Sequence, residues 1–108
     1  MSTQADAAPL TDRESAVLSG VHRQLLIDGT WVDATGGATF DVLDPSTGEV
    51  LCAVADADPA DGRRALEAAA AAQAAFARTS PRERADILTR AFTLLHERID
   101  DLALLMTL

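Results

Sequence analysis

The sequence contains two closely similar helix starts, and both lie in the second half of the chain. The first start is Asp58-Pro-Ala-Asp61 and the second is Ser80-Pro-Arg-Glu83. Each places an N-cap side chain before a Pro at the first helical position, where the missing N–H costs nothing, and a carboxylate at the third. We therefore predict that two helices begin at these points.

The two predicted helices differ in their apolar content. The first runs to about Arg78 and is rich in alanine. The second runs to about Glu97 and continues helically through Leu108 after an irregularity around Asp100 and Asp101. Its apolar residues recur at steps of three and four, which places one continuous face along Ala85, Leu88, Phe92, Leu95, Ile99 and Leu102. The last seven residues contain no Gly, Pro or basic residue, so we expect a helix that is cut off there and not ended.

Two turn signals before the helices predict two β-hairpins. Asp28-Gly29 separates two β-prone runs and accepts positive φ at both positions, which is typical of a two-residue type I′ turn. Pro45-Ser-Thr-Gly48 connects strands over residues 39–44 and 49–55, and the second of these strands is apolar at nearly every position, so it requires cover. Residues 1–20 contain few large apolar side chains and are predicted to be a disordered or loosely docked tail. The expected fold class is α/β, with two β-hairpins followed by two to three α-helices.

Length and composition exclude several functions. A chain of 108 residues forms one domain at most, which is too short for a complete large enzyme. Its net charge of -8 repels phosphate backbones and anionic lipid, so nucleic-acid binding is not expected. The chain contains no Lys and therefore no Schiff-base lysine. We expect no secretory signal, since the first residues lack an apolar stretch with a basic start. The sequence has no apolar run of the roughly 20 residues that a membrane span needs, and its single Cys suits a cytoplasmic location.

The residues that could carry chemistry have structural interpretations. Cys52 lies inside a predicted buried strand without a nearby His, so we expect an inert small hydrophobe. His96 is expected to be a partly exposed helix residue, and His22 lies at the boundary of the tail. Ser80 is interpreted as a helix cap, since the strained turn of a hydrolytic nucleophile is absent from the sequence.

The acidic residues and the glycines also do not form a recognisable catalytic or phosphate-binding motif. Asp100 and Asp101 are adjacent and would point to different sides of a helix, which does not suit paired acid/base catalysis. The turn glycines do not form a phosphate-binding fingerprint before a helix; they are Gly29, Gly36, Gly37 and Gly48. The sequence therefore predicts no catalytic, cofactor-binding or metal-binding residue.

Four stretches, in this order and spacing, resemble the N-terminal segment of the NAD(P)-dependent aldehyde dehydrogenases. They are Leu25–Ala34, Thr39–Val50, Ala55–Asp58 and Ser80–Leu88. The sequences of these stretches are most similar to the succinate-semialdehyde dehydrogenase branch, with betaine-type and other aldehyde dehydrogenases as alternatives. The resemblance covers nearly all of the chain outside the tail.

The resemblance implies a longer protein with a cofactor-binding domain, a catalytic domain and an oligomerisation element. Residues 21–108 would then be the N-terminal part of the cofactor-binding domain, truncated in its last helix, and their partner would be the remainder of the chain. The family attacks an aldehyde with a Cys thiolate, transfers hydride to NAD or NADP, and hydrolyses the acyl enzyme with water activated by a Glu, as a dimer or tetramer. All of those residues belong to motifs beyond position 108, so the chain alone is predicted to be inactive.

Two further hypotheses remain open. Some family members bind a monovalent cation through backbone carbonyls, which would be those of Val42 and Leu43 here, together with a carboxylate that would follow Leu108. The chain could instead be an independent helical interaction module that recruits a partner helix through its apolar face. Cooperative unfolding of these residues alone would favour the module, whereas we expect aggregation or a loosely packed helical state.

Overall fold

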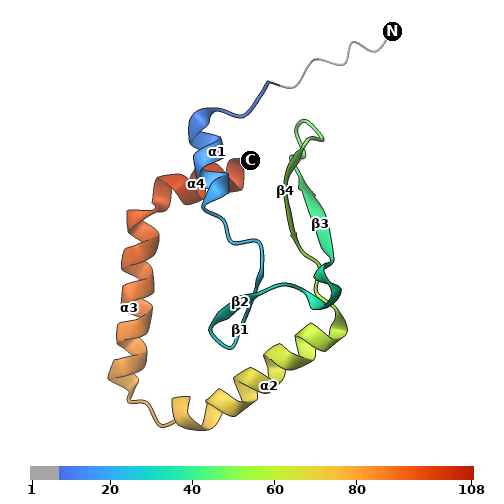
Figure 1. The fold of residues 1–108 in the computed structure, drawn as a ribbon. Coiled ribbons are helices and arrows are strands. Elements are labelled where there is room, and N and C mark those ends of the chain that lie inside the picture. The colour runs from blue at the N-terminus through green and yellow to red at the C-terminus, as the bar shows by residue number, and fades with distance from the viewer. Residues whose placement is uncertain (1–7) are drawn as a thin grey trace.

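The computed structural model describes residues 8–108, in which helices and two antiparallel hairpins follow one another around an open frame (Figure 1). The elements are α1 Asp12–Ser19, β1 Leu25–Ile27, β2 Thr30–Val32, the 3-10 turn η1 Thr35–Gly37, β3 Thr39–Leu43, β4 Val50–Ala55, α2 Pro59–Phe76, α3 Pro81–Glu97 and α4 Ile99–Thr107. The predicted α/β class, with hairpins preceding the long helices, is confirmed.

Both predicted helix starts are present with their capping boxes. Asp58 is the N-cap of α2, and its carboxylate accepts a 2.8 Å hydrogen bond from the N–H of Ala60. Ser80 is the N-cap of α3: its hydroxyl accepts from the N–H of Glu83 at 3.2 Å, and the Glu83 carboxylate accepts from the Ser80 N–H at 2.7 Å. Local side-chain bonding of this kind depends on neighbouring residues only, which is why the sequence predicts it well.

The second predicted helix ends at Glu97 as predicted, but the irregularity that follows it lies at Arg98, two residues before Asp100. Arg98 has φ -111° and ψ 15°, which interrupts the helix between α3 and α4. Asp100 and Asp101, where the irregularity was expected, instead occupy the first turn of α4. Carboxylates are favourable there because the N-terminal end of a helix carries partial positive charge.

The two hairpins form as predicted. In the first, Ile27 pairs with Thr30, while Asp28 and Gly29 have φ values of 52° and 72°. In the second, the N–H of Asp44 donates to the carbonyl of Glu49 at 2.8 Å and closes the turn.

The region predicted as a tail contains a helix that the sequence analysis did not predict. α1 begins at a capping box in which Thr11 and Glu14 exchange hydrogen bonds of 2.8 and 3.2 Å, and it packs against α4 with Leu18 buried. The Thr-x-x-Glu spacing was visible in the sequence, but the helix is short, with only a few apolar residues to reveal it. The part of the predicted tail in residues 1–7 lies outside the described residues.

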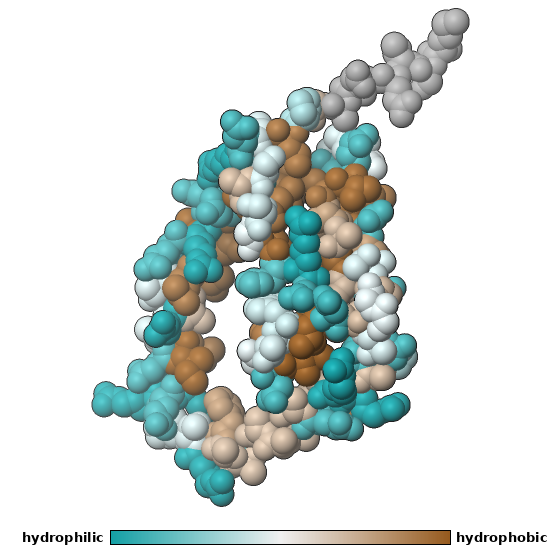
Figure 2. Space-filling model, in the orientation of Figure 1, coloured by the Kyte–Doolittle hydropathy of each residue, from teal (hydrophilic) through white to brown (hydrophobic). Residues whose placement is uncertain are grey.

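The frame encloses very little apolar core. Its radius of gyration is 18.6 Å, whereas a compact domain of this length has a value of about 13 Å. Among residues 8–108 the buried apolar side chains are Leu18 and Ala34. Figure 2 shows hydrophobic residues on the visible surface of several elements, so the cover that strand β4 requires is incomplete within these residues.

Candidate functional site: unpartnered apolar surfaces

The apolar face predicted for the second long helix is exposed to solvent. Leu88 is 72% exposed, Phe92 60% and Leu95 57%, and every residue of α3 falls in the exposed class. In Figure 1 this helix forms one side of the frame, and it meets α4 only at its end. We call the face formed by Leu88, Phe92 and Leu95 the α3 stripe. Large apolar side chains in a row are rarely this exposed, and such a patch is typical of an interaction surface.

A second apolar surface is a hollow of about 300 Å³ between α1, the β3–β4 hairpin and the end of α4. Residues from all three contribute to its lining, including Leu18, Val42, Leu43, Cys52, Leu105 and Leu108. Nearly all of the lining is apolar, and no charged side chain belongs to it. The hollow therefore suits an apolar side chain better than a polar substrate.

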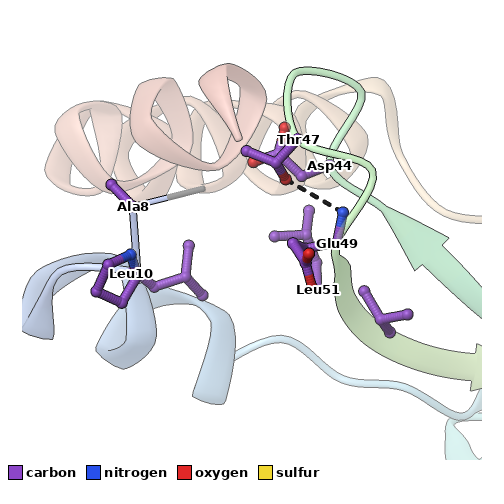
Figure 3. A pocket seen from close by; sticks show the side chains of 8 residues that line it. Ala8, Leu10, Asp44, Thr47, Glu49 and Leu51 are labelled. Carbon is purple, nitrogen blue, oxygen red and sulfur yellow. Dashed lines mark hydrogen bonds between the residues drawn. The ribbon is translucent and has the colours of Figure 1, made fainter. Parts of the chain in front are cut away.

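A more polar pocket lies where the chain before α1 passes the turn between β3 and β4 (Figure 3). Its volume is about 360 Å³, and Ala8, Asp44, Thr47 and Glu49 contribute to its lining. Asp44 accepts hydrogen bonds from the hydroxyl and the N–H of Ser46, at 2.7 and 2.8 Å, and these bonds lower the pKa of its carboxyl group. The carboxylate thus stabilises its own turn, a role that no motif in the sequence had indicated.

The best-satisfied polar group is Asp61, whose side chain is 1% exposed. Its carboxylate accepts bonds from the N–H and hydroxyl of Thr35, at 2.9 and 2.7 Å, and from the N–H of Asp58 at 2.9 Å. Arg64 also donates to it. These contacts, led by those of Thr35, hold the pKa of Asp61 far below its usual range. The group joins the start of α2 to the loop after the first hairpin, and we call it the Asp61 junction.

The predicted chemistry candidates are not brought together. Cys52 is half-buried in β4. His22 stacks on Trp31 with ring centroids 4.0 Å apart. The ring centroids of His96 and Phe92 lie 4.3 Å apart. Within residues 8–108 there is no group of three or more His, Cys, Asp or Glu side chains that could hold a metal ion.

The remaining acidic candidates have ordinary surroundings. Asp101 forms an exposed ion pair with Arg13 at 3.7 Å, which links α4 to α1. Asp100 is exposed in the first turn of α4.

The carbonyls of Val42 and Leu43, which the cation hypothesis names, lie at an irregularity in the second hairpin. Val42 pairs with Cys52, but Leu43 pairs with Val50, so the register shifts between Val42 and Leu43. The end of α4 lies at the same hollow, because Leu105 and Leu108 line it together with these residues. Cation binding at these carbonyls stays an open hypothesis.

The sequence that forms these elements is similar to known proteins. The model of the aldehyde dehydrogenase family matches residues 31–108, which is most of the chain. The chain belongs to the aldehyde dehydrogenase family. The match begins at Trp31 and includes the second hairpin and all three helices that follow it.

A curated relative supports the same assignment. A glutarate-semialdehyde dehydrogenase of Pseudomonas aeruginosa is 45% identical over 87 residues, which cover 81% of this chain and 18% of that protein. The chain therefore spans about a fifth of the length of this aldehyde dehydrogenase relative. The resemblance found in the sequence is confirmed, and the α/β frame fits an N-terminal piece of the aldehyde dehydrogenase fold.

The helices give one further result. Among residues 8–108 no helix combines the length and the apolar character that crossing a bilayer demands.

Proposed function

We propose that residues 21–108 are the N-terminal part of the cofactor-binding domain of an NAD(P)-dependent aldehyde dehydrogenase, and that they contribute packing surfaces and no catalytic group. The observation that carries this proposal is the exposure of the α3 stripe. Burying a Leu or Phe side chain stabilises a protein by about 1.5–3 kcal/mol. The three side chains of the α3 stripe could therefore contribute a large stabilisation, but within residues 21–108 they stay exposed and do not contribute it. The remainder of the polypeptide covers the stripe and the apolar hollow.

The glycines of the described residues do not fit a dinucleotide. The turn glycines all have positive φ, but each lies between two strands and none opens an α-helix; they are Gly29, Gly36, Gly37 and Gly48. A phosphate-binding loop needs backbone N–H groups that point at the phosphates from the start of a helix. NAD or NADP is therefore bound by other parts of the whole enzyme, which also supply the nucleophilic Cys.

The substrate is an aldehyde, and we place it among the semialdehydes of short dicarboxylic acids. The sequence resembles the succinate-semialdehyde branch most, and the relative is named for glutarate semialdehyde, whose chain is one carbon longer. The purified whole enzyme should be assayed with both semialdehydes and with butanal and pentanal, which match them in length but lack the carboxylate. We expect kcat/KM for a semialdehyde to exceed that of its matched aldehyde by a factor on the order of 10,000, since a site built for a polar group rejects analogues that lack it. Equal values would contradict this substrate class.

Complementation between two pieces tests the packing role directly. Residues 1–108 alone should show no dehydrogenase turnover, and co-expression with the remainder of the enzyme should restore it. Phe92→Asp in the stripe should abolish complementation, because a charge would be buried without a partner. Thr93→Asp is the matched control: Thr93 follows directly on the same helix but points away from the stripe. Turnover by residues 1–108 alone, or equal loss with both variants, would contradict the proposal.

The alternative function, an independent helical interaction module, makes a different prediction about the isolated residues. An independent module must have its own hydrophobic core. Residues 8–108 have a radius of gyration of 18.6 Å and two buried apolar side chains, which indicates that they lack such a core. Well-dispersed amide NMR signals with cooperative unfolding would support the module. Aggregation or loosely packed helices support the packing role.

For the whole enzyme we propose a dimer or tetramer in the cytoplasm, and a monovalent cation at the carbonyls of Val42 and Leu43 stays an open hypothesis. Light scattering on the purified enzyme measures the assembly. An anomalous peak beside Val42 in crystals soaked with a heavy monovalent cation tests the cation site, and a flat map there would rule it out.

A further inference from the structure

No further inference is drawn: the strongest candidate, the apolar hollow between α1, the β3–β4 hairpin and the end of α4, belongs to the surface that the proposed function already assigns to the rest of the polypeptide, and nothing in the structure shows which segment covers it.

Discussion

The Asp61 junction and the α3 stripe lie on consecutive helices that begin in the same way, yet they differ in what surrounds them. Both helices start with an N-cap, a Pro and a carboxylate at the third position. In α2 that carboxylate, Asp61, is buried and bonded to Thr35, 26 residues earlier in the chain. In α3 the equivalent Glu83 stays exposed and bonds only to its own cap.

The difference teaches that this segment completes its polar contacts but not its apolar ones. In residues 8–108 no buried side-chain nitrogen or oxygen lacks a hydrogen-bond partner. Large apolar residues on α2 and α3, by contrast, remain exposed, including Leu66, Phe76, Ile87, Leu88 and Phe92. The segment contains both partners of its buried hydrogen bonds, including Thr35 and Asp61, which lie 26 residues apart. Burial of its large apolar side chains, by contrast, requires surface from a second layer.

The largest effect is expected from a substitution in the α3 stripe. Phe92→Ala should destabilise the whole enzyme by about 3–5 kcal/mol, because it removes a ring that the rest of the protein covers. In residues 1–108 alone the same change should alter helix stability by no more than about 0.5 kcal/mol, since Phe92 is 60% exposed there. Denaturant unfolding of the whole enzyme measures the first effect, and the helix content of residues 1–108, followed by circular dichroism, measures the second. Thr93→Ala is the control and should leave both nearly unchanged; a small effect of Phe92→Ala in the whole enzyme would refute coverage of the stripe.

A second variant tests the junction. Asp61→Asn keeps one acceptor oxygen but places an NH₂ group among donors from Thr35, Asp58 and Arg64, so the Tm of the whole enzyme should fall by several degrees. Glu83→Gln is the matched control at the same helical position of α3. Because Gln also completes a capping box, its Tm should change little. Equal Tm values for both variants would mean that the contacts of Asp61 with Thr35 add nothing beyond capping.

The pH dependence of the free energy of unfolding below about pH 4 tests the contribution of Asp61 in a second way. The pKa of Asp61 is lowered on folding, chiefly by the Thr35 hydroxyl and N–H, so its stabilising effect is complete above the unfolded-state pKa of about 3.9. It is lost as the pH falls below that value toward the lower folded-state pKa. The free energy of unfolding should therefore fall less steeply between about pH 4 and pH 2 in Asp61→Asn than in the unmodified enzyme. Parallel curves in urea titrations at several pH values would show that Asp61 does not contribute.

The smallest expected effect concerns the cap of α3. Ser80→Ala removes the hydroxyl that accepts from the N–H of Glu83 and should cost about 1 kcal/mol. It should also raise the pKa of Glu83, which hydrogen bonds from the backbone and hydroxyl of Ser80 lower. Ser80→Asn, which preserves an acceptor, should recover most of the loss, as measured by urea unfolding. Failure of Asn to do so would indicate that the cap is not the origin of the effect.

The sequence predicted best where a few adjacent residues decide the structure. The Asp28-Gly29 turn, the starts of α2 and α3, and the end of α3 at Glu97 all agree with prediction. The bond between Asp61 and Thr35 could not be predicted, because it depends on the path of the chain between them. The sequence did contain Asp61 as a helix-start carboxylate, but nothing in its spacing distinguishes it from Glu83.

The sequence by itself determined the local elements, their order and the resemblance to aldehyde dehydrogenases, since caps, turns and periodic faces act over a few residues. It also placed Leu88, Phe92 and Leu95 on one face of one helix. Only the tertiary structure decided that this face is exposed, that α1 packs on α4, and that Asp61 is buried at a junction. Burial is a property of surfaces brought together from distant parts of a chain, and no short stretch of sequence specifies it.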